Sequence, residues 1–104
     1  MKFRLPIEKF TNQPTQIVRR AGYFRIFDSK TGHESFIRKL TADRYPRFHL
    51  YLMEEDDEII FDLHLDQRAT RYEGQTAHNA DYESEEVRTE LTRIYSIVKQ
   101  NMKV

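Results

Sequence analysis

The chain has 104 residues, 38% of them hydrophobic, and contains no cysteine. That length corresponds to one domain, residues 1–104, and the absence of cysteine excludes both disulfide bonds and thiolate metal sites. No apolar run approaches the ~20 residues of a transmembrane helix, and the first residues carry no apolar leader segment. We therefore expect a soluble cytoplasmic protein that does not contact a membrane.

The charges cancel overall but are unevenly distributed along the chain. Residues 1–50 hold 11 lysines and arginines against 4 acidic residues, a net charge of +7, whereas residues 51–104 hold 6 against 13, a net charge of −7. Three explanations fit: a basic face for nucleic acid, a homodimer of self-complementary surfaces, and cancellation within one sheet in which the two halves interleave. We favour cancellation, because the basic residues are scattered and charged residues usually face solvent.

The N-terminal segment predicts a short strand followed by a loop. Residues 2–7 alternate polar and apolar side chains, which is typical of a strand with one buried face. Pro6 limits this strand to a sheet edge or a strand end, because proline cannot donate a hydrogen bond to a neighbouring strand. Residues 8–16 contain Asn12 and Pro14 and predict a loop.

The next segment predicts a first β-hairpin. Residues 16–27 are rich in β-branched and aromatic side chains, which favours a strand, and Gly22 within them predicts a bulge or bend. Residues 28–32, DSKTG, have the composition of a turn, and residues 34–40 form the returning strand. A connector, residues 41–46, leads to the next hairpin.

Residues 47–67 are the most informative segment, because two runs in it alternate with a period of two around the acidic turn EEDDE. One face of this predicted second hairpin is apolar and carries Phe48, Leu50, Leu52, Ile59, Phe61, Leu63 and Leu65. The opposite face carries His49, Asp62, His64 and Asp66. Two registers of the turn preserve the apolar pairing, and they place His49 opposite either His64 or Asp62.

The C-terminal segment predicts the longest helix. Residues 67–83 lack a clear period and predict a loop, whereas residues 84–102 have a helical period. Ser84 is a favourable N-cap, and two glutamates follow it in the first turn, where the helix dipole favours negative charge. The apolar stripe consists of Val87, Leu91, Ile94, Tyr95, Val98 and Met102. We expect an α+β fold: an antiparallel sheet of four to five strands, in two hairpins, packed by one long C-terminal helix.

The polar face of the second hairpin is the first candidate site. His49, His64 and Asp66 fall within cross-strand reach in either register. His78, in the following loop, can fold back over them. Two or three imidazoles with a carboxylate suit a divalent transition metal such as zinc, whose bound water would attack an ester or a phosphate, and Asp62 would orient one imidazole. The simpler explanation is a solvent-exposed sheet surface with ordinary His–Asp pairs and no cofactor. A third alternative is acid–base chemistry or ligand binding by the same residues without a metal.

A second candidate site is basic and aromatic. It consists of Arg19, Arg20, Tyr23, Arg25 and Arg38 in the predicted first hairpin. Cations interleaved with aromatic rings can hold the phosphates and stack the bases of single-stranded nucleic acid. The chain contains no RNP-like motif and no glycine-rich phosphate loop, so the ordinary polar faces of strands are the simpler explanation.

The order of the segments GYFRIF, TGHESFIRKL, YPRFHLYL, FDLHLDQ and AHNADYE resembles a family of short uncharacterised bacterial proteins from candidate-phylum genomes. The resemblance covers roughly residues 20–100. It implies a stand-alone bacterial protein, and it implies no activity, no catalytic residue and no ligand.

Three functions therefore stand beside one another. The first is a small cytoplasmic binding or interaction domain without catalytic activity, whose partner is an unknown protein or a second copy of the chain. The second is a metal-binding protein or a metal-dependent hydrolase that uses the histidines and aspartates of the second hairpin. The third is a single-stranded nucleic-acid binder that uses the arginines of the first.

Overall fold

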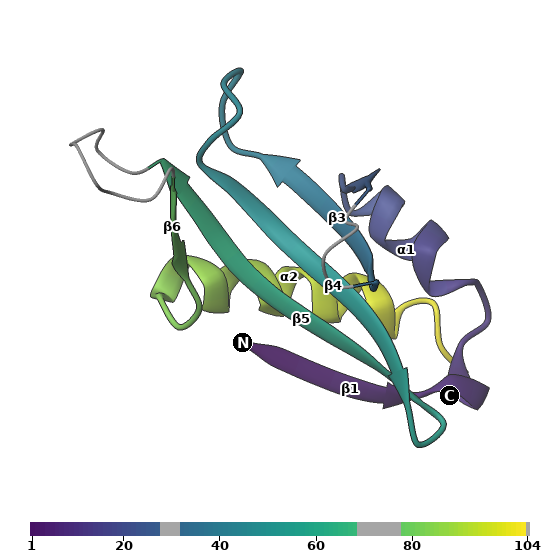
Figure 1. Ribbon diagram of the computed structural model, residues 1–104. Coiled ribbons are helices and arrows are strands. Elements are labelled where there is room, and N and C mark those ends of the chain that lie inside the picture. Colours follow the sequence, from purple (N-terminus) through teal and green to yellow (C-terminus); the bar gives the residue numbers. More distant parts are fainter. Residues whose placement is uncertain (28–31, 69–77, 104) are drawn as a thin grey trace.

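The computed structural model describes residues 1–27, 32–68 and 78–103. The strands of its sheet are β1 (Lys2–Pro6), β2 (Phe24–Ile26), β3 (Glu34–Lys39), β4 (Arg47–Glu55), β5 (Glu58–Arg68) and β6 (His78–Asp81). The helices are a 3-10 turn, η1 (Ile7–Lys9), and two α-helices, α1 (Pro14–Arg20) and α2 (Glu85–Lys99). The strand order is β1-β5-β4-β3-β2, and β6 pairs with the end of β5; α2 crosses one face of the sheet (Figure 1).

The predicted α+β fold is confirmed. All strand pairs are antiparallel, β2 with β3 and β4 with β5 form the two hairpins, and α2 is the long C-terminal helix. Strand β6 is an additional short strand within the segment predicted as a loop. Apart from Gly32, the predicted turn at residues 28–32 lies outside the described residues. Neither α-helix of the described chain is long and apolar enough to cross a membrane.

Residues 16–20 correct the sequence prediction. They belong to α1 and not to a strand, and α1 also takes the end of the predicted loop at residues 8–16. Pro14 stands in its first turn, where the missing N–H has no helical partner to lose. At the other end Gly22 has φ 99°, and its amide and the next one donate to carbonyls of the last turn, which is a Schellman cap. This pair of end signals outweighs the β-branched residues between them.

The β4–β5 hairpin closes through a two-residue turn. The strands pair up to both ends of this turn, which leaves only Asp56 and Asp57 at the tip, with φ 53° and 62°. Two consecutive positive φ angles are typical of a type I′ turn, whose twist matches the twist of the strands that it joins. This turn selects one of the two registers left open by the sequence and places His49 directly opposite His64.

Helix α2 supplies one wall of the core. The Ser84 hydroxyl accepts a hydrogen bond from the Val87 amide at 3.2 Å, which is the predicted N-cap. The buried members of the stripe are Val87, Leu91, Ile94 and Val98, and they pack on the apolar residues of β4 and β5. The helix ends at Lys99, three residues before the predicted end, and Met102 instead bridges to Phe10.

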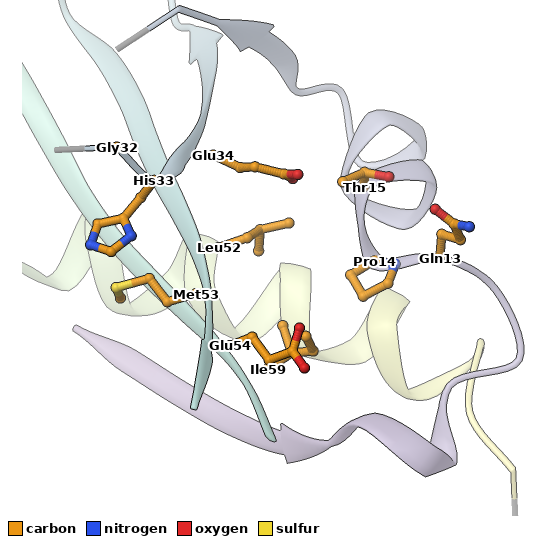
Figure 2. Close-up of a pocket in the computed structure, with 10 residues that line it drawn as sticks. All are labelled: Gln13, Pro14, Thr15, Gly32, His33, Glu34, Leu52, Met53, Glu54 and Ile59. Atoms are coloured by element: carbon orange, nitrogen blue, oxygen red, sulfur yellow. The ribbon is translucent and has the colours of Figure 1, made fainter. Parts of the chain in front are cut away.

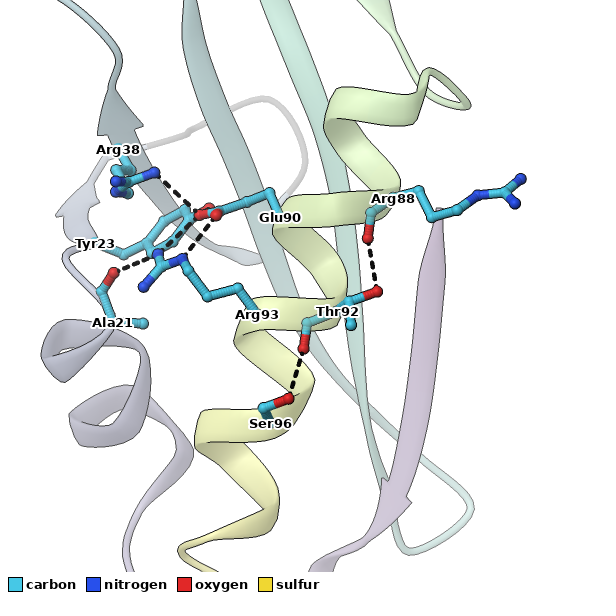
Figure 3. A network of polar contacts seen from close by, with 8 residues as sticks. All are labelled: Ala21, Tyr23, Arg38, Arg88, Glu90, Thr92, Arg93 and Ser96. Atoms are coloured by element: carbon cyan, nitrogen blue, oxygen red, sulfur yellow. Dashed lines mark hydrogen bonds and ion pairs between the residues drawn. The ribbon is translucent and has the colours of Figure 1, made fainter.

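A buried ionic network ties α2 to β3 and to the segment between α1 and β2 (Figure 3). Glu90 is 5% exposed and accepts from the Tyr23 hydroxyl at 2.7 Å and from two nitrogens of Arg93 at 2.8 and 2.9 Å. Arg93 also donates to the Ala21 carbonyl, and Arg38 lies 3.4 Å from Glu90. Burial raises the pKa of Tyr23, and the Glu90 carboxylate raises it further.

Candidate metal site

The predicted polar face of the second hairpin lies on the side of the sheet away from α2, because its residues alternate with the core residues of β4 and β5. The part of this face around Asp66 is buried and not exposed to solvent. His49 is 7% exposed, His64 7% and Asp66 3%. His49 is flanked by His64 on β5 and by the buried Ile37 on β3, its partners in the two neighbouring strands. We call His49, His64 and Asp66 the histidine–aspartate cluster.

Asp66 lies at the centre of the histidine–aspartate cluster. Its Oδ2 atom is 3.1 Å from His49 Nδ1, and its Oδ1 atom is 2.7 Å from His64 Nε2. An ionised carboxylate only accepts hydrogen bonds, so in the metal-free protein both of these nitrogens donate. One carboxylate therefore connects an imidazole of β4 to an imidazole of β5.

Arg47 adds a permanent cation to the same carboxylate. Its Nε donates to Asp66 Oδ2 at 3.2 Å, and its guanidinium lies 4.8 Å from the centre of the Tyr45 ring. Burial by itself would raise the pKa of the Asp66 carboxyl, but its hydrogen bonds and electrostatic interactions with His49 and His64 outweigh burial. The pKa of Asp66 lies well below its usual value, and the carboxylate stays ionised.

Neighbouring side chains enclose the two imidazoles. Ser35 of β3 has no exposed surface, and its hydroxyl forms a hydrogen bond with His49 Nε2. The Tyr51 ring lies 4.5 Å from the His49 ring and 5.7 Å from the His64 ring, and Tyr82 covers His64 at 5.1 Å. Ser35 and Tyr82 were not predicted as part of the site, because the pairing of separate hairpins and the path of the loop are not encoded in a period of two.

The donor set fits a divalent transition metal. One ligand atom from each member of the cluster lies within 4.8 Å of the other two. Zinc bonds of ~2.0–2.2 Å in a tetrahedral site place ligand atoms about 3.4 Å apart, and the two Asp66 contacts, made by different carboxylate oxygens at 2.7 and 3.1 Å, are somewhat shorter than that spacing. Imidazole nitrogens favour zinc, copper, iron or nickel over magnesium or calcium.

Ser35, His49 and Asp66 also stand in the order of a nucleophile, a base and an orienting carboxylate. Burial excludes that role in this structure. The complete enclosure of Ser35 keeps any substrate carbonyl away from its hydroxyl. We therefore assign the contact between Ser35 and His49 to the architecture of the cluster.

Asp62, predicted to orient one imidazole of the metal site, lies apart from the cluster. Asp62 is half-exposed, and its carboxylate is 3.8 Å from the N-terminal ammonium group. His78 begins β6, where its backbone pairs with Arg68, whereas Ala80 is the residue opposite Asp66. The His78 side chain and the loop at residues 69–77 lie outside the described part of the chain, so ligation by His78 stays a prediction.

The predicted nucleic-acid residues do not form one exposed surface. Tyr23 is 1% exposed and hydrogen-bonds to Glu90, so it offers no ring for a base, and Arg38 pairs with the same carboxylate. Arg19, Arg20 and Arg25 are exposed. Phe24, which was not among the predicted residues, is 70% exposed and lines a hollow of about 540 Å³ together with Arg19 and Arg25.

A further cavity of about 320 Å³ lies between the start of α1 and the strands β3, β4 and β5. Figure 2 shows Glu34 extending across it toward Thr15, with Leu52 beneath. Glu34 and Glu54 supply the carboxylates that line this cavity, and both residues are exposed, unlike the buried Asp66. Within the described residues, the histidine–aspartate cluster is the group of donors with metal-binding spacing.

No protein-family model, no curated protein and no solved structure matches this chain. The resemblance to short candidate-phylum proteins therefore stays a prediction, and a function can be inferred only from the site itself.

Proposed function

We propose that this protein binds a divalent transition metal through His49, His64 and Asp66. The observation that carries the proposal is the burial of three potential ligands from two paired strands within 4.8 Å of one another. The β4–β5 register and the strand period preposition the three donors, so binding requires little ordering of side chains.

Metal binding is favoured here over metal-dependent hydrolysis. A hydrolytic metal needs an open position for water and substrate. The three ligand residues are each less than a tenth exposed, and the Tyr51 and Tyr82 rings pack on the imidazoles. A binding role, in which the metal stabilises this face of the sheet or is stored there, agrees with that enclosure.

The competing explanation is a metal-free network. Within the described residues every buried polar side-chain atom has a hydrogen-bond partner, so the cluster is complete without an ion. The two explanations differ in one measurable respect. A metal that binds only the folded state raises the free energy of unfolding by about 2.7 kcal/mol at a hundredfold excess over its Kd, whereas a metal-free network gains nothing.

The test is titration of chelator-stripped protein with Zn²⁺, Co²⁺, Ni²⁺ and Mn²⁺ by calorimetry, with thermal unfolding followed in parallel. We expect one ion per chain, a higher Tm with the preferred ion, and loss of both effects in His64→Ala and Asp66→Asn. His33→Ala is the matched control, because His33 lies on the exposed surface outside the cluster. Absence of binding by the wild-type chain, or equal loss in His33→Ala, would contradict the proposal.

A further inference from the structure

We infer that Ser35 is a positioning residue that directs the Nδ1 atom of His49, and not its Nε2 atom, to the metal. This inference rests on the proposed function. Histidine offers two nitrogens, and the hydrogen bond made by one of them decides which is free to bind a metal. At His49 that choice is made by a side chain from a neighbouring strand.

The geometry around the His49 ring separates its two nitrogens. Nδ1 faces the cluster and lies 3.1 Å from Asp66 Oδ2. Nε2 faces β3, where it forms a hydrogen bond with the Ser35 hydroxyl. Because Ser35 has no exposed surface, water does not compete for that bond at the hydroxyl. His64 differs, since its Nε2 atom is the one that faces Asp66, at 2.7 Å.

A serine hydroxyl suits this position because it both donates and accepts. In the metal-free protein with neutral His49, Nδ1–H donates to Asp66 and Nε2 accepts from the Ser35 O–H. When a metal binds Nδ1, that proton leaves Nδ1 and an equivalent proton is taken up at Nε2, which then donates to Ser35 Oγ. The imidazole stays neutral, and its proton count is unchanged. Ser35 satisfies Nε2 in both states.

The first test compares metal affinity in Ser35→Ala and Ser35→Thr. Loss of the hydroxyl leaves a buried ring nitrogen without its partner, and removal of such a partner typically lowers metal affinity about 10–100-fold. We expect that loss in Ser35→Ala, and affinity within a few-fold of wild type in Ser35→Thr. Ser96→Ala is the control, since Ser96 is an exposed serine on α2. Wild-type affinity in Ser35→Ala would overturn the inference.

A second measurement reads the tautomer directly in the wild-type chain. Nitrogen-15 NMR of labelled histidines should show His49 protonated at Nδ1 without metal, and protonated at Nε2 with Nδ1 ligated after Zn²⁺ is added. Ligation through Nε2 would overturn the inference even if metal binding is confirmed. Absence of zinc binding by wild type would instead overturn the proposed function, and the inference with it.

Discussion

At the scale of single residues, Arg47 is the side chain that most directly opposes a metal in the cluster. Its Nε atom contacts the same Asp66 oxygen that faces His49. Its side chain is only 13% exposed, so solvent screens this charge less than it would at the surface. A dication bound to Asp66 would repel this guanidinium, whereas the metal-free carboxylate is stabilised by it.

We therefore predict that Arg47→Gln binds Zn²⁺ or Co²⁺ more tightly than wild type. Removing one neighbouring positive charge should raise the affinity about tenfold or more, which corresponds to at least ~1.4 kcal/mol. Calorimetric titration measures the change, and Co²⁺ absorbance reports it independently. The control is Arg4→Gln, because the Arg4–Glu58 pair is more exposed and lies outside the cluster. An affinity equal to or below that of wild type would contradict this role of Arg47.

The site could be predicted from the sequence only in part. The period of two in β4 and β5 correctly placed His49, His64 and Asp66 together on one face. It did not predict that this face is buried, since polar alternation normally indicates solvent. Ser35 was missed because its contact with His49 depends on how β3 pairs with β4, across a connector whose geometry no local motif determines.

At the scale of elements, the β4–β5 turn is a place where sequence and backbone conflict. Asp56 and Asp57 both adopt positive φ, which costs free energy for residues with a side chain, although aspartate tolerates it better than most. The turn also lies within five consecutive acidic residues, 54–58, which repel one another. The same turn sets the β4–β5 register that brings the histidine–aspartate cluster together, so the free-energy cost of the turn accompanies the geometry of the site.

The double substitution Asp56→Asn and Asp57→Gly should stabilise the protein. Asn-Gly is the preferred type I′ pair, and we expect a gain of about 1 kcal/mol in the free energy of unfolding from relief of the backbone. Urea denaturation measures it. Asp43→Asn, at an exposed position outside the sheet, controls for the removal of one negative charge. A loss of stability, or an equal gain in the control, would contradict this account of the turn.

Helices α1 and α2 show why one helix was predicted and the other was not. Helix α2 has 15 residues, an N-cap serine and a full apolar stripe, so several signals agree. Helix α1 has 7 residues, and its buried Ile17 and Val18 also suit a strand. Only Pro14 and Gly22 indicate the helix, and the same glycine is equally compatible with a strand bulge.

At the scale of the whole molecule, the opposite charges of the two halves meet inside one fold. Strand β5, from the acidic half, lies between β1 and β4. Within the part of the chain that the structure describes, ion pairs join arginines of the first fifty residues to carboxylates of the remainder, among them Arg4–Glu58, Arg38–Glu90 and Arg47–Asp66. This supports cancellation as the explanation of the asymmetry. Binding of nucleic acid and formation of a homodimer stay predictions.

Glu90, which pairs with Arg38, makes the free energy of unfolding depend on pH. Burial raises the pKa of this carboxyl, but hydrogen bonds from Arg93 and Tyr23 and the charges of Arg93 and Arg38 outweigh burial, so its pKa is lowered in the folded state. The unfolded chain, with a glutamate pKa of about 4.3, therefore binds more protons below that pH. The stabilising contribution of Glu90 is complete above this value and is lost as the pH falls below it.

We predict that Glu90→Gln is about 1–3 kcal/mol less stable than wild type at pH 7, because the charged hydrogen bonds to Arg93 are weakened within a buried site. The difference should shrink steadily between about pH 5 and pH 3, as the wild-type carboxylate becomes protonated on unfolding. Urea denaturation at a series of pH values measures both chains under the same conditions, so the other acidic groups cancel in the comparison. Glu86→Gln, an exposed neighbour in the first turn of α2, should show little change at any pH. A constant difference from pH 7 to pH 3 would mean that Glu90 stabilises the fold by packing and not by its charge.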